Sequence, residues 1–271
     1  MTSSTQGRVL ILAGSDSGGG AGVQADIKTV TVLGGYAATA ITAITVQDTL
    51  GVQMAVRLHP ELIAAQARAV LDDIGADAFK TGMLGGRKAV EAVAELLEGA
   101  AEIPAVIDPV MIAKGGQSLL SNKALAAFKA RLIPRADLLT PNAPEAEALT
   151  GIAVVDLDGQ RRAGEALLKA GAKAVLVKGG HVPGSTVIDL LLTASGESLL
   201  EGSRIDTRHT HGTGCTLAAA CATGLAQGMK MEAAVARAWA YTAEAIRRAP
   251  GFGQGFGPLD HGWPLRTSSE P

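Results

Sequence analysis

Short apolar runs alternate with longer helical patterns along most of the chain, and this alternation constrains the fold more than any other feature. The runs are nearly all apolar, which is typical of strands buried on both faces of a parallel sheet. Parallel neighbours need crossover helices, so the pattern predicts βαβ units. We expect strands at residues 8–13, 37–46, 78–81, 105–108, 138–140, 174–178 and 187–192, and helices at 22–33, 60–74, 87–97, 123–131, 143–149 and 159–170.

The 271 residues would suit one large α/β domain or two small ones. Neither an internal repeat nor a long linker interrupts the alternation, which favours a single domain over residues 1–271. We expect its core at 8–261 and flexible ends at 1–7 and 262–271. The glycine- and proline-rich stretch from residue 251 loses periodicity and predicts a surface wrap or a frayed end.

Composition excludes several classes of protein. Lys and Arg number 24 against 26 Asp and Glu, and aromatic residues make up 3%, so neither a basic footprint nor a stacking surface for nucleic acid is expected. The apolar run at 9–13 is too short for a signal peptide, and no stretch reaches the ~18 apolar residues of a membrane span. Cys215 and Cys221 would lie ~9 Å apart along one helix, too far for a disulfide. We expect a cytoplasmic enzyme without a membrane or nucleic-acid partner.

Polar residues follow almost every expected strand. Ligands of open α/β sheets bind outside the carboxyl ends of the strands, so these residues are the first candidates for a site. Their number around one rim predicts a polar ligand with several recognised parts. The segments are 14–20, 47–49, 81–83, 108–111, 140–145 and 178–181.

The segment 211–216, His-Gly-Thr-Gly-Cys-Thr, opens an alanine-rich helix that runs to Leu225. Its glycines and the helix N-terminus would form an anion hole for a phosphoryl group in transfer. The alternative is an ordinary helix start that Thr213 caps. Cys215 lies in the first turn, where the pKa of a thiol is lowered and the thiolate can accept a proton. Its alternative role is a small buried side chain beside the glycines.

Oxygen ligands and one cation follow neighbouring strands. Asn142 and Glu145 are three residues apart at a helix start and could hold Mg²⁺ through waters, with Asp108 as a third ligand. For Glu145, interaction with the helix dipole accounts for the pattern equally well. Lys178 ends an apolar strand, where a compact positive charge suits the oxygens of a triphosphate.

Two common nucleotide sites do not match. The chain has no G-x-x-x-x-G-K-[ST] segment, which excludes a Walker-type site. Residues 20–25 match G-x-G-x-x-A, but they begin several residues after the strand, and no acidic residue ends a second strand at the required spacing. A dehydrogenase with a nicotinamide cofactor is therefore a weak alternative.

Several long motifs together resemble the hydroxymethylpyrimidine/phosphomethylpyrimidine kinases of the ribokinase-like superfamily, in the same order and over residues 8–261. The resemblance implies a three-layer αβα sandwich with a mostly parallel sheet and a homodimer. It also implies transfer of phosphate from ATP, with Mg²⁺, to 4-amino-5-hydroxymethyl-2-methylpyrimidine and then to its monophosphate, in thiamine biosynthesis. The motifs are residues 13–26, 47–52, 80–84, 108–111 and 211–216.

The resemblance also implies a role for individual residues. Asp26 and Gln47 would bind the aminopyrimidine edge, and Cys215 stands where related sugar kinases place their aspartate base. The other roles fall into four groups: Gly14, Ala21, Met83 and Val110 line the pyrimidine pocket; Asp108, Asn142 and Glu145 handle Mg²⁺; Lys178, Thr210, Thr213 and Asn142 contact the nucleotide; and Gly212 and Gly214, with Cys215, form the anion hole.

Two residues depart from the family pattern, since Asp48 and His209 replace asparagines. An inward-pointing Asp48 would weaken binding of a monophosphate, whereas an outward-pointing one would change nothing. The alternatives to the pyrimidine kinase are a pyridoxine or pyridoxal kinase and a non-catalytic pyrimidine-binding regulator. By composition alone, residues 114–117 are a candidate lid.

Overall fold

The computed structural model describes residues 6–111 and 121–267. Within them, one nine-stranded sheet has the order β3-β2-β1-β4-β5-β6-β7-β8-β9. The strands from β2 through β1, β4, β5 and β6 to β7 run parallel, and β3, β8 and β9 are antiparallel additions at the two edges. The bounds are β1 Arg8–Ser15, β2 Tyr36–Gln47, β3 Val52–Arg57, β4 Ala78–Thr81, β5 Ala105–Ile107, β6 Leu138–Leu139, β7 Ala174–Val177, β8 Thr186–Thr193 and β9 Gly196–Ser203.

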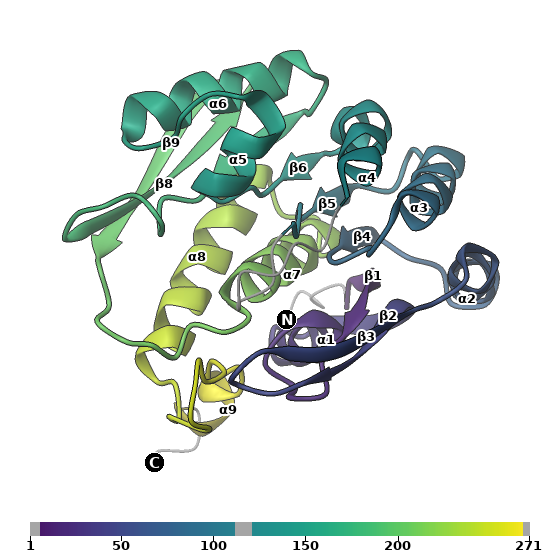
Figure 1. Cartoon of the computed structure of the whole chain (residues 1–271), viewed down its shortest axis with the longest axis horizontal. Helices are drawn as coiled ribbons and strands as arrows, with labels where there is room; N and C mark the ends of the chain where they lie inside the picture. The colour runs from purple at the N-terminus through teal and green to yellow at the C-terminus, as the bar shows by residue number, and fades with distance from the viewer. Residues whose placement is uncertain (1–5, 112–120, 268–271) are drawn as a thin grey trace, which may run out of the picture.

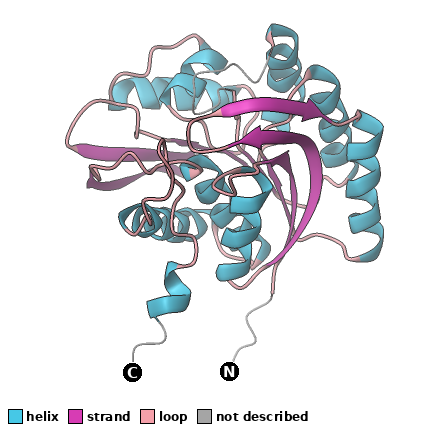
Figure 2. Cartoon of the chain, turned by 60° about the horizontal axis from the view of Figure 1, so that its bottom comes forward, coloured by secondary structure: helices cyan, strands magenta, loops and turns pink. Residues whose placement is uncertain are grey.

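Helices cover both faces of the sheet (Figures 1 and 2). Figure 1 shows α2 to α6 along one face and α1, α7 and α8 along the other. The first group is α2 Pro60–Asp73, α3 Arg87–Gly99, α4 Asn122–Ala127 with the π-turn η1 Phe128–Leu132 and the 3₁₀ turn η2 Ile133–Arg135, α5 Ala143–Thr150 and α6 Leu157–Lys169. The second is α1 Gly22–Val32, α7 Thr213–Ala226 and α8 Met231–Arg247, and the short α9 Trp263–Thr267 follows.

Alternation of side chains along the strands divides the interior into two cores. In β1, Leu10 and Leu12 point into the core beneath α2 to α6, whereas Val9 and Ile11 point into the core beneath α1, α7 and α8. All four side chains are buried. The three-layer αβα sandwich with a mostly parallel sheet that the resemblance implied is therefore confirmed.

The central elements match the sequence expectations to within a few residues, but β3, β9, α8 and the short α9 were missed. Strand β3 is exposed on both faces from Gln53 to Arg57, so it lacks the apolar pattern of a buried strand. Strand β9 is also mostly exposed. Helix α8 buries a stripe made largely of alanines, whose small side chains give a weak periodic signal.

The carboxyl-terminal segment over residues 251–267 packs on the body of the protein. Leu259 and His261 are buried, and Tyr241 donates a hydrogen bond to the carbonyl of His261 at 2.7 Å. Trp263 stacks on the ring of Tyr241 with centroids 6.1 Å apart. These contacts favour the surface wrap over the frayed end. Residues 263–267 form α9, and residues 1–5 and 268–271 of the expected flexible ends lie outside the described residues.

His261 makes the docked segment sensitive to acid. Its Nε2 lies 2.9 Å from Thr216 Oγ1 in α7, and burial lowers the pKa of His261 to about 4. Below pH ~6.5 the unfolded chain therefore binds a proton at this histidine, whereas the folded chain does not bind it until about pH 4. The free energy of unfolding is therefore highest, as far as this group is concerned, above pH ~6.5. It falls as the pH drops from ~6.5 to about 4.

We expect His261→Gln to remove this acid sensitivity. Between pH 7.5 and 4.5, the wild-type free energy of unfolding should fall by about 2–3 kcal/mol more than that of the variant. Urea unfolding at both pH values measures the difference. His59→Gln, at an exposed histidine, is the control and should follow the wild type. An equal loss in the His261 variant and the wild type would contradict the prediction.

The two cysteines both lie in α7 as free thiols, Cys215 partly exposed and Cys221 buried. Cys221 belongs to the core beneath α7 and α8, as its apolar surroundings in the sequence indicated. Among the helices of the described residues, none combines the length and the apolar character needed to cross a bilayer.

Candidate active site

A lysine and an aspartate meet at the carboxyl edge of the parallel strands. Lys178 follows β7 and Asp108 follows β5, and Lys178 Nζ lies 3.1 Å from Asp108 Oδ1. Thr140, which follows β6 between them, donates a hydrogen bond to the same oxygen at 3.0 Å. Burial acts to lower the pKa of Lys178, but the charges of Asp108 and Glu145 outweigh it and raise the pKa. The ammonium group therefore keeps its charge at the rim where the sequence predicted a phosphate site.

The N-terminus of α7 lies directly beside this pair. A Cβ atom on Gly214 would stand 3.2 Å from Lys178 Nζ and 3.5 Å from Asp108 Oδ2. Gly212 is the N-cap with φ 88°, and a side chain there would collide with the carbonyl of Gly20. Only glycine satisfies both the left-handed backbone and this close approach. The segment 211–216 and Lys178, far apart in sequence, thus form one site.

No side chain caps α7, which decides between the two interpretations of Thr213. Its hydroxyl donates to the carbonyl of Thr210 at 2.9 Å and so stabilises the turn before the helix. The positive end of the helix dipole is consequently left for a ligand. This arrangement supports the anion hole over the ordinary capped helix start.

Cys215 has the expected position but not the expected acidity. Burial raises the pKa of its thiol to about 11, although the charge of Lys80 and a hydrogen bond from the backbone of Gly22 act in the opposite direction. The expectation of a lowered pKa is therefore wrong, because removal from water outweighs the helix N-terminus. At neutral pH, Cys215 is a thiol and not a thiolate.

Asn142 and Glu145 form a reciprocal capping box at the start of α5. The Asn142 side chain accepts from the backbone N–H of Glu145 at 2.9 Å, and the Glu145 carboxylate accepts from that of Asn142 at 2.8 Å. The structural role that the sequence left open for Glu145 is thus present. The backbones of Asn142 and Lys178 also form an isolated parallel β-bridge. Both residues therefore lie beside Asp108.

The same residues suit Mg²⁺. Burial raises the pKa of Glu145 to about 7, and the charge of Asp108 adds to this effect, while Lys178 opposes it. A divalent cation would relieve the crowding of these carboxylates. In the part of the chain that the structure describes, no group of three or more His, Cys, Asp or Glu could hold a metal. An ion here would complete its shell with water and phosphate oxygens, as Mg²⁺ commonly does.

Asp26 forms an ion pair inside the protein. Its carboxylate is fully buried and lies 2.7 Å from Lys80 Nζ, which is fully buried as well. Burial acts to lower the pKa of Lys80, but the charges of Asp26 and Asp108 outweigh it and raise the pKa. The other oxygen of this carboxylate, Oδ1, is buried without a hydrogen-bond partner among the described residues, so the binding of the aminopyrimidine edge by Asp26 stays a prediction.

Asp16, which the sequence analysis did not single out, organises the glycine-rich turn after β1. Its Oδ1 accepts from Gly18 N at 2.8 Å, and its Oδ2 accepts from Gly20 N at 3.1 Å and from Ala21 N at 2.8 Å. His211 Nε2 also lies 2.8 Å from Oδ2. Burial opposes ionisation of Asp16, but these hydrogen bonds outweigh it and lower its pKa. Asp16 thus joins the turn to the anion-hole segment.

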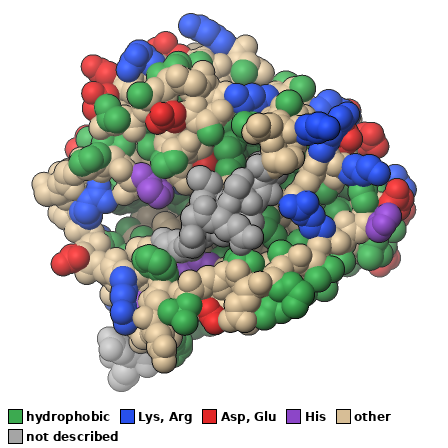
Figure 3. Space-filling model, in the orientation of Figure 1, with side chains coloured by type: hydrophobic (Ala, Val, Ile, Leu, Met, Phe, Trp, Pro, Cys, Tyr) green, Lys and Arg blue, Asp and Glu red, His purple; other side chains and the backbone are tan. Residues whose placement is uncertain are grey.

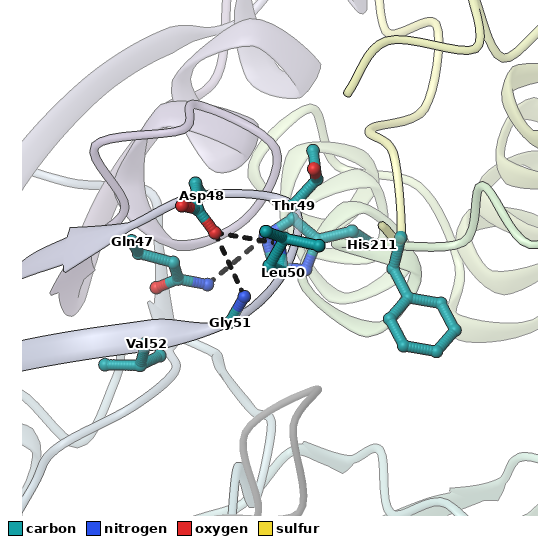
Figure 4. Close-up of a pocket in the computed structure, with 8 residues that line it drawn as sticks. Gln47, Asp48, Thr49, Leu50, Gly51, Val52 and His211 are labelled. Carbon is teal, nitrogen blue, oxygen red and sulfur yellow. Dashed lines mark hydrogen bonds between the residues drawn. The ribbon is translucent and has the colours of Figure 1, made fainter. Parts of the chain in front are cut away.

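A hollow opens at the end of β2, beside His211 (Figure 4). Figure 4 shows the Gln47 amide turned toward the imidazole of His211, 3.3 Å from its Nε2. Of the other expected pocket residues, Gly14 lies against Met83, since a Cβ on Gly14 would overlap the methionine methyl group. The hollow is lined by Gln47, Asp48, Thr49, Leu50, Gly51, Val52, His211 and Phe256.

Ala21 and Val110, two further residues expected at the pyrimidine pocket, follow β1 and β5. Ala21 is the N-cap of α1 and is held by Asp16, and Val110 is partly exposed two residues after Asp108. Residues 114–117, the candidate lid, lie outside the described residues.

Asp48 and His209, which depart from the family pattern, have local structural roles. Asp48 is exposed, and its carboxylate accepts hydrogen bonds from the backbone of Leu50 and Gly51 and from the side chain of Gln53. It therefore closes the turn between β2 and β3, which corresponds to the outward-pointing alternative. His209 packs against Gly257 of the carboxyl-terminal segment.

Comparison with known proteins decides the family. Residues 16–260 match the family described as phosphomethylpyrimidine kinase. The chain belongs to the phosphomethylpyrimidine kinase family. It is 50% identical over 257 residues to the hydroxymethylpyrimidine/phosphomethylpyrimidine kinase of Streptomyces coelicolor, covering 95% of each chain. It is 46% identical over 256 residues to a thiamine biosynthesis bifunctional protein of Geobacter sulfurreducens, covering 94% of this chain and 52% of that one.

Among solved structures, an ADP complex of pyridoxal kinase from Bacillus subtilis is similar, with a TM-score of 0.89 and 34% identity over 95% of this chain and 98% of that chain. The phosphomethylpyrimidine kinase family therefore shares this fold with a pyridoxal kinase. Membership of the family makes this chain a kinase and hence a transferase, as the resemblance of its motifs implied.

Three residues of the site escaped the sequence analysis as individual candidates: Asp16, Lys80 and His211. All three lie in the motifs quoted above. Lys80 carried the clearest signal, because a lysine inside a short apolar strand needs a buried partner. Nothing in the spacing shows that Asp16 and His211 meet, since 195 residues separate them.

Proposed function

We propose that this chain transfers the terminal phosphate of ATP to the 5-hydroxymethyl group of 4-amino-5-hydroxymethyl-2-methylpyrimidine, and then phosphorylates the monophosphate, in thiamine biosynthesis. One observation carries the proposal: the charged Lys178 lies against Gly214 at the uncapped N-terminus of α7. Phosphoryl transfer depends mainly on positioning and on neutralising charge, and this arrangement supplies both.

Each part of the site has one task in this proposal. The backbone from Gly212 to Gly214 and the ammonium of Lys178 stabilise negative charge on the phosphate in transfer. Asp108, Asn142 and Glu145 would hold Mg²⁺, which neutralises the phosphate oxygens when it is bound. Thr210 shapes the turn before α7 through its carbonyl. Gln47 binds the aminopyrimidine edge across the hollow from the transfer site.

The direct test is incubation of the protein with Mg-ATP and the hydroxymethylpyrimidine, followed by mass spectrometry of the products. We expect the monophosphate first and the diphosphate later, and neither product when EDTA replaces Mg²⁺. A non-catalytic regulator would bind the pyrimidine without consuming ATP, so that outcome would refute the proposal.

Pyridoxal phosphorylation is the second candidate function, because the similar solved structure is a pyridoxal kinase. Both substrates are aromatic rings with a hydroxymethyl group, and the same anion hole could serve either. Parallel assays with pyridoxal and with the hydroxymethylpyrimidine compare kcat/KM. We expect the pyrimidine to be preferred.

Cys215 should assist the first phosphorylation more than the second. Only the thiolate of Cys215 can accept the alcohol proton, which the loose transition state releases late, so Cys215 must first lose its own proton, a step that the charge of Lys80 favours. The monophosphate, in contrast, presents an ionised acceptor and needs no base. We expect Cys215→Ala to lower kcat for the first step by about 10–100-fold, near the lower limit of general acid–base effects, and for the second step by less than about threefold.

Cys221→Ala, in the same helix but fully buried away from the rim, is the matched control for this experiment. It should lower the free energy of unfolding slightly and leave the ratio of the two rates unchanged. An equal loss in both steps for Cys215→Ala would contradict the role as proton acceptor.

The protein is also proposed to be a cytoplasmic homodimer. Hydrophobic side chains gather along the β2–β3 edge (Figure 3), where Ile44, Val46, Met54 and Val56 are exposed. An exposed apolar edge strand favours association with a second copy. Light scattering after gel filtration measures the mass, and a monomer at micromolar concentration would contradict the dimer.

The free thiols of Cys215 and Cys221 suit a reducing compartment.

A further inference from the structure

A buried carboxylate, that of Asp189, binds the residue that follows Lys178. Its Oδ1 accepts from the backbone N–H of Gly179 at 2.7 Å. Asp189 lies in the middle of β8, and its side chain is on the same face of the sheet as that of Leu191, which packs in the core beneath α1, α7 and α8. A carboxylate in such surroundings costs free energy unless hydrogen bonds compensate for its lost hydration.

The ladder between β7 and β8 ends just before Lys178. Its last pair is Val177 with Leu190. One further step would place Lys178 opposite Asp189. Lys178 instead donates its N–H to the carbonyl of Pro141, which follows β6, at 2.8 Å. The chain therefore turns away from β8 at the residue whose ammonium group lies at the rim.

Side chains fill the gap that opens between the two strands. Gln160 of α6 donates its amide NH₂ to the carbonyls of Val177 and Ile188, both at 2.9 Å. A Cβ on Gly179 would stand 2.0 Å from the carbonyl oxygen of Ile188, so only glycine can pass this point. The N–H of Gly179 has no strand partner here, and the carboxylate of Asp189 supplies the acceptor that a buried N–H needs.

Both peptide groups that flank the Cα atom of Lys178 are thus fixed by hydrogen bonds. The N–H on one side is bound to Pro141 and the N–H on the other side to Asp189. Lysine has a flexible four-carbon side chain, so the direction in which it leaves the backbone limits where its ammonium group can lie. With the backbone fixed in this way, Nζ lies 3.1 Å from Asp108 Oδ1 and next to Gly214.

The charge of Asp189 acts in the same direction as its hydrogen bond. Burial raises its pKa to about 6, whereas the N–H of Gly179, the charge of Lys178 and the indole of Trp239 act to lower it. The carboxylate is therefore ionised at pH 8, and it favours the charged form of Lys178. An ionised acceptor also makes the stronger hydrogen bond to a backbone N–H.

We propose that Asp189 is a positioning residue for phosphoryl transfer: by holding the N–H of Gly179, it fixes Lys178 so that the ammonium group meets the phosphate at the N-terminus of α7. The inference rests on the proposed function. Asp189 takes no part in making or breaking bonds and acts through Lys178. A displacement of ~1 Å at the reacting groups can cost ~10²-fold in rate, so such an anchor affects kcat without touching the substrate.

The test compares two substitutions of Asp189 at pH 8. Asp189→Leu removes the acceptor, so kcat for both phosphorylation steps should fall by about 10–100-fold, while KM for the pyrimidine stays the same. Asp189→Asn loses the charge but keeps an oxygen that accepts from Gly179, so its kcat should stay within about threefold of the wild type. Glu201→Leu, at an exposed carboxylate of β9, is the control and should match the wild type.

The Lys178→Met background separates positioning from a general effect on the fold. If Asp189 acts through Lys178, adding Asp189→Leu to Lys178→Met should lower kcat by less than about threefold. A larger further loss would show a merely structural role and overturn the proposal. So would an Asp189→Leu enzyme with the kcat of the wild type.

Hydrogen–deuterium exchange followed by NMR measures the anchor without an assay of activity. The amide of Gly179 should exchange slowly in the wild type and in Asp189→Asn, and fast exchange in the wild type would overturn the proposal even if Asp189→Leu does not fold. If the pyrimidine is not phosphorylated, the proposed function fails. The same variants with pyridoxal as the acceptor, together with the exchange of Gly179, then still decide the role of Asp189.

Discussion

We expect Lys178→Met to lower kcat for both phosphorylation steps by about 10²–10³-fold, the effect of removing one donor that stabilises charge in a transition state. The variant keeps most of the side chain's volume but removes the charge beside Gly214 and Asp108. KM for the pyrimidine should change little, because the residue proposed to bind it, Gln47, ends β2 and Lys178 follows β7. Steady-state kinetics with saturating ATP measures both constants.

Lys173→Met is the matched control, since Lys173 precedes β7 but is exposed and pairs with Asp137 on the surface. Its kcat should stay within about twofold of the wild type. The loss of its exposed ion pair should cost at most about 1 kcal/mol of unfolding free energy, so the variant should fold. Circular dichroism checks that both variants fold. A Lys178→Met enzyme that retained more than a tenth of the wild-type kcat would show that this lysine does not act on the transferred phosphate.

The second large effect is expected at the buried pair of Lys80 and Asp26. Lys80→Met leaves the Asp26 carboxylate without its cation in a site where both side chains are inaccessible to water. Removing one partner of such a pair costs about 3–5 kcal/mol of unfolding free energy. The double variant Asp26→Leu/Lys80→Met should recover most of that loss, because it leaves no unpaired charge.

Urea unfolding of the two single variants and the double variant gives the coupling energy directly. Arg87→Met, which breaks the exposed pair of Arg87 and Glu91, is the control and should cost less than about 1 kcal/mol. A loss below about 1 kcal/mol for Lys80→Met would mean that water or another group compensates Asp26. In the double variant, any remaining loss of activity would report how much the pair contributes to the environment of Cys215.

The elements of the central sheet could be predicted from the sequence because their burial is nearly uniform. Strands such as β4 (Ala78–Thr81) and β7 (Ala174–Val177) are buried at every position, and a short apolar run between two helical patterns is typical of such a strand. Strand β3 could not be found in this way, because its position depends on pairing with β2 and not on burial of its own side chains.

The site residues divide in the same manner. Gly212, Gly214 and Lys178 could be assigned from their place after a strand or before a helix, since local geometry gives them their chemistry. The pairing of Asp26 with Lys80 could not be predicted, because the two residues are 54 positions apart in the sequence. The acidity of Cys215 was misjudged for a related reason, because burial depends on what packs over the thiol.

The sequence by itself determined the parallel sheet, the rim where polar residues follow the strands and the glycines at the start of α7, which we propose to bring backbone amides to a phosphate. These properties follow from local periodicity and from the conformational freedom of glycine. Only the tertiary structure decided which charged groups are paired in the interior and which way a side chain faces: Asp26 toward Lys80, and His211 between Asp16 and Gln47. The reason is physical, since hydrogen-bond geometry and loss of hydration depend on neighbours that are remote along the chain.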